Sequence, residues 1–463
     1  MRLNFVSSGA AVLLSLMAFG VTSLTAKPAP PACKFASVTF NGWKSEQMSN
    51  EWVALTFVPQ LGGRLMQVAF GSHSYLFVNA RLKGQYFPPS VEAAQNRWYN
   101  YGGDKIWPMP EGSKDEQHWA GAVGEPLDDS AFSLKILSRG STCAVRLTGP
   151  ADPQTGLQYS RVVSITNLSP GISFHAEMKN VTGHPVHWSE QSVSQYNAGD
   201  TPDPSGFNHD FGAYTPASRD SVYLNGYHVR AGPAENPQYA VQNGMFTLRY
   251  MHVGGEVWVD SPGGWLAVVD GTTGYAMVER FHYQKGADYP GKATVIFYTT
   301  GQPYVSRHYP GAAGPPPPQP NPIYYMEAEV NSPVVELEPG KTFTMDTEWR
   351  PARTGQHFTK ATYAGVVSAP LSAVAEQAGV ALSGSFGVFY AGELVAHLYD
   401  RDGMPAGVVR LEPADPLNLV TLRQMIPAPV SVARVSVHLV DPQGLDRGSL
   451  GEAQVSPAVG ESQ

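Results

Sequence analysis

The sequence predicts an all-β protein, with one large antiparallel β domain followed by a small C-terminal β-sandwich. Three observations support this fold class. Segments that alternate apolar and polar residues recur along the 463-residue chain, its 47 glycines and 39 prolines suit tight turns between strands, and aromatic residues reach 11%. Amphipathic helical periodicity is scarce.

The clearest strand covers residues 172–178. Ile172, Phe174, Ala176 and Met178 alternate there with polar residues, so these four side chains are expected to face a core. Further strands are expected at Thr294–Tyr298, Ile323–Val330 and Thr342–Trp349, and a hairpin is expected from Glu256–Asp260 and Trp265–Val269 across the turn Ser261–Gly264. Helix is expected only after Ser90 and at Leu371–Ala378.

Residues 1–26 are typical of a signal peptide. Arg2 gives a positive start, Ala10–Val21 is apolar, and Ala26 offers a small residue for cleavage. No later stretch reaches about 18 apolar residues, so no membrane span is expected. We therefore expect an exported protein, periplasmic or extracellular. The formal charge of −8, without a cluster of Lys and Arg, leaves no footprint for a nucleic-acid partner.

Two β domains are expected after the signal peptide. The first, residues 33–353, contains a Pro-rich insertion at 310–322, which is read as a surface excursion because strands continue on both sides. The second, residues 362–456, has short strand-like segments separated by turns, as in a β-sandwich. Its strands are expected at Gly384–Tyr390, Leu394–Tyr399, Gly407–Leu411, Leu419–Leu422 and Val430–Val440.

Cys33 and Cys143 are the two cysteines of the chain. In an oxidising compartment they could form one disulfide that ties the mature N-terminus to the body, or they could remain unpaired thiols. Neither arrangement supplies a Cys-x-x-Cys redox motif or a cysteine-rich metal site. We expect no cofactor and no metal.

The segment Asn100–Gly112 concentrates unusual residue types. Its glycines permit special backbone torsions and its prolines remove donors, so a rigid loop is expected to present Asp104, Lys105 and Trp107. Charges beside an indole suit a sugar, whose hydroxyls need polar partners and whose C–H face needs a flat apolar surface. Arg64 could add paired hydrogen bonds to vicinal hydroxyls. Ion pairs for the charges, and a core position for Trp107, are the alternatives.

Acidic residues alternate along the strand expected at Ile323–Val330. Residues two apart on a strand lie on the same face. One face would therefore carry Tyr325, Glu327 and Glu329, and the other would carry Met326, Ala328 and Val330. If that face lines a cleft, partial burial and like-charge proximity would raise one pKa toward neutrality and provide a general base. The alternative is an ordinary solvent-facing side of a sheet.

His184 and His187 stand three residues apart, but Gly183 and Pro185 argue against a helix, and on a strand the two imidazoles point to opposite sides. A two-histidine metal site is therefore disfavoured. His187 could serve as a general acid near neutral pH, with Trp188 facing the core. A surface or satisfied core histidine is the alternative.

Several of these motifs together resemble a known family. Pro59–Arg64, Tyr101–Pro108 and Tyr325–Pro333, with the turn Leu337–Gly340, are similar to an uncharacterised bacterial family of the galactose-mutarotase-like superfamily, over roughly Phe40–Trp349. The resemblance implies a large antiparallel supersandwich that binds a carbohydrate. In aldose epimerases of this fold a late Glu takes the anomeric hydroxyl proton and a His protonates the ring oxygen.

Carried onto this chain, the resemblance implies Glu327 as the base, with Glu329 as its rival. The chain lacks the His-x-Tyr-Phe-Asn run of the family's acid, so His187 is assigned that role as a hypothesis. Arg64, Asp104, Lys105, Trp107, Glu329 and Tyr325 are the expected substrate contacts. The predicted function is carbohydrate recognition with aldose 1-epimerase-like interconversion of anomers. A non-catalytic binding or scaffold protein, and a polysaccharide lyase or glycoside hydrolase accessory activity, remain the alternatives.

Overall fold

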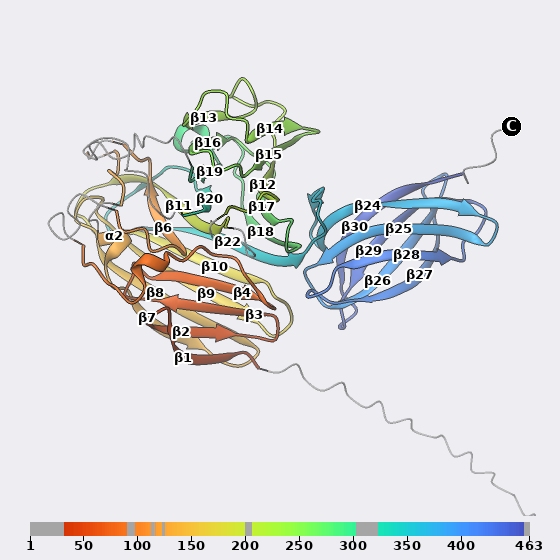
Figure 1. Ribbon diagram of the computed structural model, residues 1–463, viewed down its shortest axis with the longest axis horizontal. Helices are drawn as coiled ribbons and strands as arrows, with labels where there is room; N and C mark the ends of the chain where they lie inside the picture. The colour runs from red at the N-terminus through yellow and green to blue at the C-terminus, as the bar shows by residue number, and fades with distance from the viewer. Residues whose placement is uncertain are drawn as a thin grey trace, which may run out of the picture. The chain divides into compact units, whose positions relative to one another are not determined.

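The computed structural model describes residues 32–89, 98–112, 115, 117–122, 126–199, 206–301 and 323–457. The expected signal peptide, the helical turn after Ser90 and the Pro-rich insertion lie largely or wholly outside these ranges. The described chain is almost entirely β-structure, arranged in two large sheets and a separate C-terminal sheet (Figure 1). The predicted all-β fold class is confirmed.

The first large sheet has 12 strands, and every pairing in it is antiparallel. In spatial order its main path is β1 (Lys34–Phe40), β2 (Trp43–Ser49), β3 (Val53–Val58), β4 (Arg64–Phe70), β6 (Asp104–Met109), β11 (Val186–Asn197), β20 (Tyr325–Asn331), β19 (Val295–Thr299), β16 (Gly255–Val259) and β13 (His228–Ala231). Two short strands lie off this path, β5 (His73–Ser74) beside β4 and β21 (Val335–Leu337) beside β11.

The second large sheet has 10 strands and is also antiparallel. Its order is β14 (Tyr239–Gln242), β15 (Met245–Arg249), β12 (Phe211–Pro216), β17 (Trp265–Asp270), β18 (Tyr275–Phe281), β22 (Thr342–Arg353), β10 (Ile172–Asn180), β9 (Leu157–Thr166), β8 (Thr142–Ala151) and β7 (Ser133–Ser138). The predicted alternation along 172–178 is confirmed, because β10 buries Ile172, Phe174, Ala176 and Met178.

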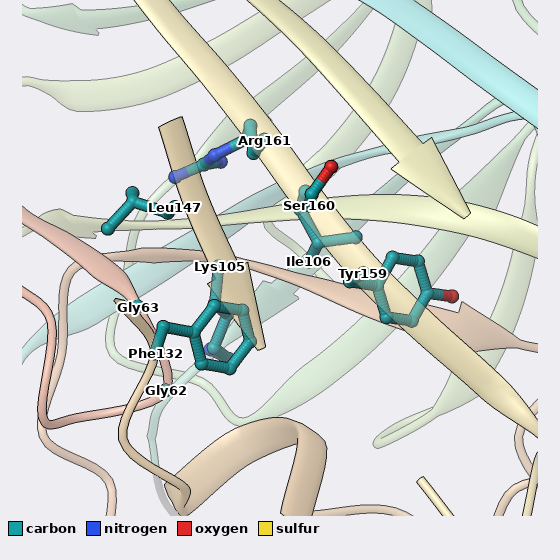
Figure 2. Close-up of a pocket in the computed structure, with 9 residues that line it drawn as sticks. All are labelled: Gly62, Gly63, Lys105, Ile106, Phe132, Leu147, Tyr159, Ser160 and Arg161. Carbon is teal, nitrogen blue, oxygen red and sulfur yellow. The ribbon is translucent and has the colours of Figure 1, made fainter. Parts of the chain in front are cut away.

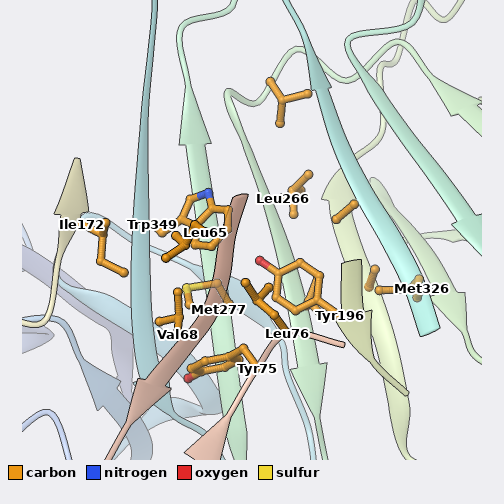
Figure 3. Close-up of a cluster of buried hydrophobic side chains, with 14 of the residues drawn as sticks. Leu65, Val68, Tyr75, Leu76, Ile172, Tyr196, Leu266, Met277, Met326 and Trp349 are labelled. Carbon is orange, nitrogen blue, oxygen red and sulfur yellow. The ribbon is translucent and has the colours of Figure 1, made fainter. Parts of the chain in front are cut away.

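The two large sheets share one hydrophobic core. Leu65, Tyr196 and Met326 of the 12-stranded sheet lie in the same buried cluster as Met277 and Trp349 of the 10-stranded sheet (Figure 3). A cluster that draws side chains from both sheets is the interior of a sandwich.

The C-terminal sheet has eight strands and a hydrophobic core of its own. Its order is β27 (Pro405–Ala414), β26 (Gly392–Asp400), β29 (Val432–Val440), β30 (Asp446–Ser456), β24 (Gly365–Glu376), β25 (Gly379–Val388) and β28 (Val420–Ile426), with β23 (Lys360–Ala361) beside β24. The two end strands β27 and β28 also contact each other, so the sheet nearly closes into a barrel.

Helix is confined to short pieces in the described part of the chain. These are α2 (Pro126–Asp129) and the 3₁₀ turns η1 (Ala80–Leu82) and η2 (Pro290–Lys292). None of the described helices has the length and apolar character needed to cross a bilayer.

Two local predictions are wrong. Leu371–Ala378 is not helical, since β24 runs through most of it, where Leu371 and Ala373 are buried with period-two spacing. Glu256–Asp260 and Trp265–Val269 do not form a hairpin, because β16 belongs to the 12-stranded sheet and β17 to the 10-stranded sheet. The turn between them carries the chain from one sheet to the other.

Cys33 and Cys143 form a disulfide across a sequence separation of 110 residues. It joins the residue that precedes β1 in one sheet to β8 in the other. Of the two arrangements considered from the sequence, a disulfide or two unpaired thiols, the structure has the disulfide. A crosslink over so long a loop restricts the unfolded chain strongly.

Removing this crosslink is therefore expected to destabilise the protein. Cys33→Ser combined with Cys143→Ser should lower the free energy of unfolding by about 2–4 kcal/mol, measured by urea titration of the intrinsic fluorescence. Reduction of the wild type should reproduce the loss, whereas reductant should leave the double variant unchanged. Equal urea midpoints for the oxidised wild type and the double variant would contradict a stabilising crosslink.

Candidate functional site

The candidate site lies on one face of three neighbouring strands, β6, β11 and β20. Cross-strand partners in an antiparallel sheet point to the same side, and the register pairs Lys105 with Val193, Val193 with Glu329, and Gln195 with Glu327. We call this set of side chains the carboxylate face. It comprises Lys105, Gln191, Gln195, Tyr325, Glu327 and Glu329.

The predicted sharing of a face along β20 is confirmed. Met326, Ala328 and Val330 point into the hydrophobic core, so Glu327 and Glu329 point to the other side. That side is not an ordinary wet face, because the two glutamates are only 5% and 8% exposed. Buried carboxylates are rare in proteins and require partners.

The partners of the two glutamates are amides and a lysine. Gln195 Nε2 donates to Glu327 Oε1 at 2.6 Å, and Gln191 Nε2 donates to Glu329 Oε2 at 2.6 Å. Lys105 Nζ lies 3.7 Å from Glu327 Oε1. Lys105 therefore forms an ion pair with Glu327, and this contact gives Glu327 a different electrostatic environment from Glu329.

The environment shifts all three pKa values in ways that follow from this geometry. Burial raises the pKa of Glu327, while Lys105 and the amide of Gln195 oppose that shift. Burial and then the charge of Glu327 hold the pKa of Glu329 well above its ordinary value. Burial lowers the pKa of Lys105, with Glu327 opposing. Lys105 thus opposes the effect of burial at Glu327, whereas the charge of Glu327 adds to the effect of burial at Glu329.

Lys105 is held by aromatic rings as well as by charge. Its Nζ lies 4.2 Å from the ring centroid of Trp107 and 5.5 Å from that of Trp98. Such contacts stabilise an ammonium by roughly 0.5–2 kcal/mol. The Nζ makes no hydrogen bond to any residue of the described chain, so its N–H groups are available for an oxygen acceptor.

Tyr325 joins the same face through its ring. It stacks on Phe77 with centroids 4.9 Å apart and lies 6.0 Å from the ring of Tyr298. The structure thus brings together Lys105, Tyr325, Glu327 and Glu329 among the predicted site residues. Trp107 pairs with Gln191 and lies on the same side of the sheet, whereas Arg64, Asp104 and His187 are engaged in other contacts.

Arg64 is occupied by structural contacts. It is fully buried, its Nη2 lies 2.7 Å from Asp128 Oδ1, and its other donors reach the carbonyl oxygens of Leu61, Gly102 and Asp128. The predicted contact with sugar hydroxyls is therefore replaced by the alternative, an internal ion pair.

Trp107 is an anchor in the core. It is 5% exposed, packs against Trp119 with centroids 5.2 Å apart, and donates its indole N–H to Asp128 Oδ1 at 3.0 Å. Lys105 lies over its ring. The ring is thus already used by the protein, which corrects the expectation that it stacks on a ligand.

Asp104 points away from the carboxylate face. It pairs in register with Leu65 of the core, and its carboxylate lies 2.5 Å from Arg161 Nη1 and 3.2 Å from Ser194 Oγ. The segment is not the predicted irregular loop, since Asp104–Met109 forms β6. Alternation along a strand sends Asp104 and Lys105 to opposite sides.

His187 is remote from the two glutamates. It lies on the exposed start of β11, where its Nε2 meets Glu336 Oε2 at 2.7 Å and its side chain is 56% exposed. Gln195, the partner of Glu327, is eight residues further along β11, roughly 26 Å at about 3.3 Å per residue. His187 therefore cannot act as the acid for a substrate held by Glu327. Trp188 does face the core, as predicted.

A small cavity lies beside β6. It is lined by Gly62, Gly63, Lys105, Ile106, Phe132, Leu147, Tyr159, Ser160 and Arg161 (Figure 2). Its volume of ≈ 10 Å³ is about what one water molecule needs. A sugar ring does not fit there.

Asp128, Gln191 and Gln195 are site residues that the sequence analysis missed. Asp128 of α2 accepts from Arg64, Trp107 and Trp98 at 2.7–3.0 Å, so one carboxylate fixes both indoles that flank Lys105. No motif marks Asp128. The glutamines had a signal, because the run from Glu190 to Gln195 is polar on both faces of a strand.

Another buried acid, Glu279 of β18, lies between the large sheets. Tyr196 Oη donates to Glu279 Oε1 at 2.5 Å, and Glu279 is 1% exposed. Burial raises the pKa of Glu279 from its ordinary value to about 8, and the hydrogen bond from Tyr196 opposes that shift. The folded protein therefore holds a proton that the unfolded chain releases near pH 4.5.

Loss of Arg64 should be costly because it leaves Asp128 buried without its cation. Arg64→Met is expected to lower the free energy of unfolding by about 3–5 kcal/mol, measured by urea titration. Arg146→Met, which removes a partly exposed pair with Glu177, is the control and should cost under about 1 kcal/mol. If Arg64→Met lowers the free energy of unfolding no more than the control does, the buried pair of Arg64 and Asp128 is not important for stability.

Glu279 should make stability depend on pH. Its contribution is fully present below about pH 4.5 and is lost as pH rises through about 8. Glu279→Gln should therefore gain stability relative to the wild type between pH 5 and 8.5, by about 1.4 kcal/mol per pH unit at most. Unfolding titrations at both pH values measure this, with exposed Glu376→Gln as control. Parallel profiles for the wild type and Glu279→Gln would refute it.

Solved structures share parts of this architecture. The chain matches a TPR-domain containing protein from Parabacteroides distasonis at 12% identity, covering 69% of this chain and 48% of that one with a TM-score of 0.45. It matches a putative mutarotase from Salmonella typhimurium at 11% identity, with 69% and 94% covered and a TM-score of 0.44. A galactose mutarotase-like protein from Clostridium acetobutylicum matches at 10% identity, with 70% and 99% covered and a TM-score of 0.42. The chain spans about half the length of the first of these proteins.

No curated protein matches the chain. A family model does match, and it covers most of the two large sheets. It describes a domain of unknown function, DUF4380, and matches residues 44–351. The protein therefore belongs to the DUF4380 family.

Proposed function

We propose that the protein is exported and binds a carbohydrate at the carboxylate face, where Glu327 and Glu329 interconvert the anomers of an aldose. The observation that carries the proposal is the convergence of Lys105, Glu327 and Glu329 on one buried face. Carboxylates accept hydrogen bonds from sugar hydroxyls, and an ammonium with unused N–H groups donates to sugar oxygens.

The two glutamates supply the acid and the base of the proposed reaction. Glu327, beside Lys105, is the carboxylate that takes the proton of the anomeric hydroxyl. Glu329, whose pKa is raised by burial and by the charge of Glu327, gives a proton to the ring oxygen as the bond between that oxygen and the anomeric carbon breaks. The open aldehyde then turns, and the reverse transfers close the ring as the other anomer. Two acids driven apart in pKa are a recognised route to such a pair.

Two further features support the proposal. The sequence resembles galactose-mutarotase-like proteins in the segments that build this face. The disulfide between Cys33 and Cys143 suits an oxidising compartment, in agreement with the signal peptide expected at residues 1–26.

A non-catalytic binding protein is the second candidate. The observation that favours it is the enclosure of the face, since Lys105, Glu327 and Glu329 are all less than 9% exposed. In that case Lys105, Glu327 and Glu329 stabilise one another's charges and position a ligand without reacting with it.

Polarimetry tests the proposal. The protein should accelerate mutarotation of freshly dissolved aldoses from a panel of hexoses, pentoses and hexuronic acids. Glu327→Gln should lower that rate by about 10²-fold or more, because a general base is lost, while thermal stabilisation by the same sugar persists.

Glu336→Gln is the matched control, since Glu336 is an exposed acid on the neighbouring β21. It should keep the wild-type rate. Sugar-induced thermal stabilisation without any acceleration would establish the non-catalytic candidate. A panel that produces neither effect would reject carbohydrate binding at this face.

A further inference from the structure

The C-terminal sheet carries a histidine pair that the proposed function does not use. His397 lies on β26 and His438 on the neighbouring strand β29. Ala396, Leu398 and Leu439 are buried in the core of this sheet, so the two histidines point outward. Asp446, the first residue of β30, lies beside them.

We propose that His397, His438 and Asp446 bind a divalent transition-metal ion of the zinc class. One ligand atom from each of the three side chains lies within 4.8 Å of those of the other two. The two imidazole rings have centroids 4.6 Å apart. A zinc ion bonds to such atoms at about 2.0–2.2 Å, so modest rotation of these partly exposed side chains closes the site.

Surrounding hydrogen bonds already orient two of the three ligands. His438 Nδ1 lies 2.8 Å from Asp446 Oδ2, and the Gly448 amide donates to Asp446 Oδ1 at 2.8 Å. His438 Nε2 lies 3.0 Å from Ser436 Oγ, which is itself 3.1 Å from Ser449 Oγ. Partners of this kind fix the ring orientation of metal-binding histidines.

The turn before Asp446 is fixed as well. Asp441 accepts from the amides of Gln443 and Leu445 at 2.9 Å, and its other oxygen pairs with Arg447 at 2.7 Å. Asp446 therefore starts β30 from a braced turn. This bracing fixes the backbone position from which the carboxylate of Asp446 extends.

The protonation states suit a cation. Burial, and then the neighbouring His438, lower the pKa of His397, so its imidazole is neutral and carries a free lone pair near neutral pH. His438 Nδ1 and Asp446 Oδ2, which lie 2.8 Å apart, are the two atoms that would face the same ion.

The ligand types select the class of metal. Two imidazoles with one carboxylate suit zinc, cobalt, nickel or copper, whereas calcium and magnesium prefer all-oxygen sites. Three protein ligands leave at least one position for water or for a further ligand. Because the ligands come from three strands, the ion would tie β26, β29 and β30 together.

Calorimetry with zinc alone tests the site on the whole protein, purified without a polyhistidine tag and stripped by chelator. One zinc ion per chain is expected in the wild type. His397→Ala and His438→Ala should each weaken binding by about tenfold or more, and Ser436→Ala by about tenfold through loss of ring orientation. Cobalt should give visible absorption bands in the wild type that the double histidine variant lacks.

His184→Ala is the matched control, because His184 is an exposed histidine of the other domain and should leave zinc binding unchanged. His397→Gln combined with His438→Gln keeps the volume of the side chains, and its unfolding curve in chelator should match that of the wild type. Absence of a stoichiometric zinc site in the wild type, or equal affinity in the double variant, would overturn the proposal. Activity on sugars is not part of the readout, so the outcome is independent of the carboxylate face.

Discussion

A strand that is buried on both faces cannot rely on water to satisfy its polar groups, and this constraint shapes the centre of the 12-stranded sheet. β11 sends Gln191 and Gln195 to one side and Ser194 to the other, and each donates to a carboxylate of a neighbouring strand. An unpaired buried charge would cost several kcal/mol, which is a large part of the stability of a domain. The central strands are therefore held in register by polar pairing as well as by the apolar core.

The same constraint explains why one carboxylate governs the candidate site. Asp128 holds Arg64 and both indoles that flank Lys105, so the position of the ammonium beside Glu327 depends on a residue of a four-residue helix outside the sheet. Lys105 in turn gives the two glutamates different electrostatic environments, because its Nζ lies 3.7 Å from Glu327 Oε1. The different electrostatic environments of Glu327 and Glu329 are thus a product of packing that starts at Asp128.

The fold was predictable from the sequence to a greater extent than the site. Period-two alternation of apolar and polar residues predicts β10 and β20, and the placement of Glu327 and Glu329 opposite Met326 follows from strand geometry alone. Sequence cannot show which sheet a strand joins, so β16 and β17 were paired wrongly as a hairpin. Nor can it show what lies across from a side chain. Arg64 and Trp107 have the residue types of a sugar site. Both instead donate hydrogen bonds to Asp128, which is distant from them in sequence.

His187 shows the limit of reasoning from residue type most clearly. An imidazole and a carboxylate can exchange protons with one substrate only if they lie a few ångströms apart, and an extended strand separates residues by about 3.3 Å for each step. His187 and the partner of Glu327 lie on the same strand, eight steps apart. Because β11 is extended, His187 and Gln195 are far apart in space although they are close in sequence. Glu329, by contrast, occupies the next alternate position beside Glu327 on β20, and burial raises its pKa.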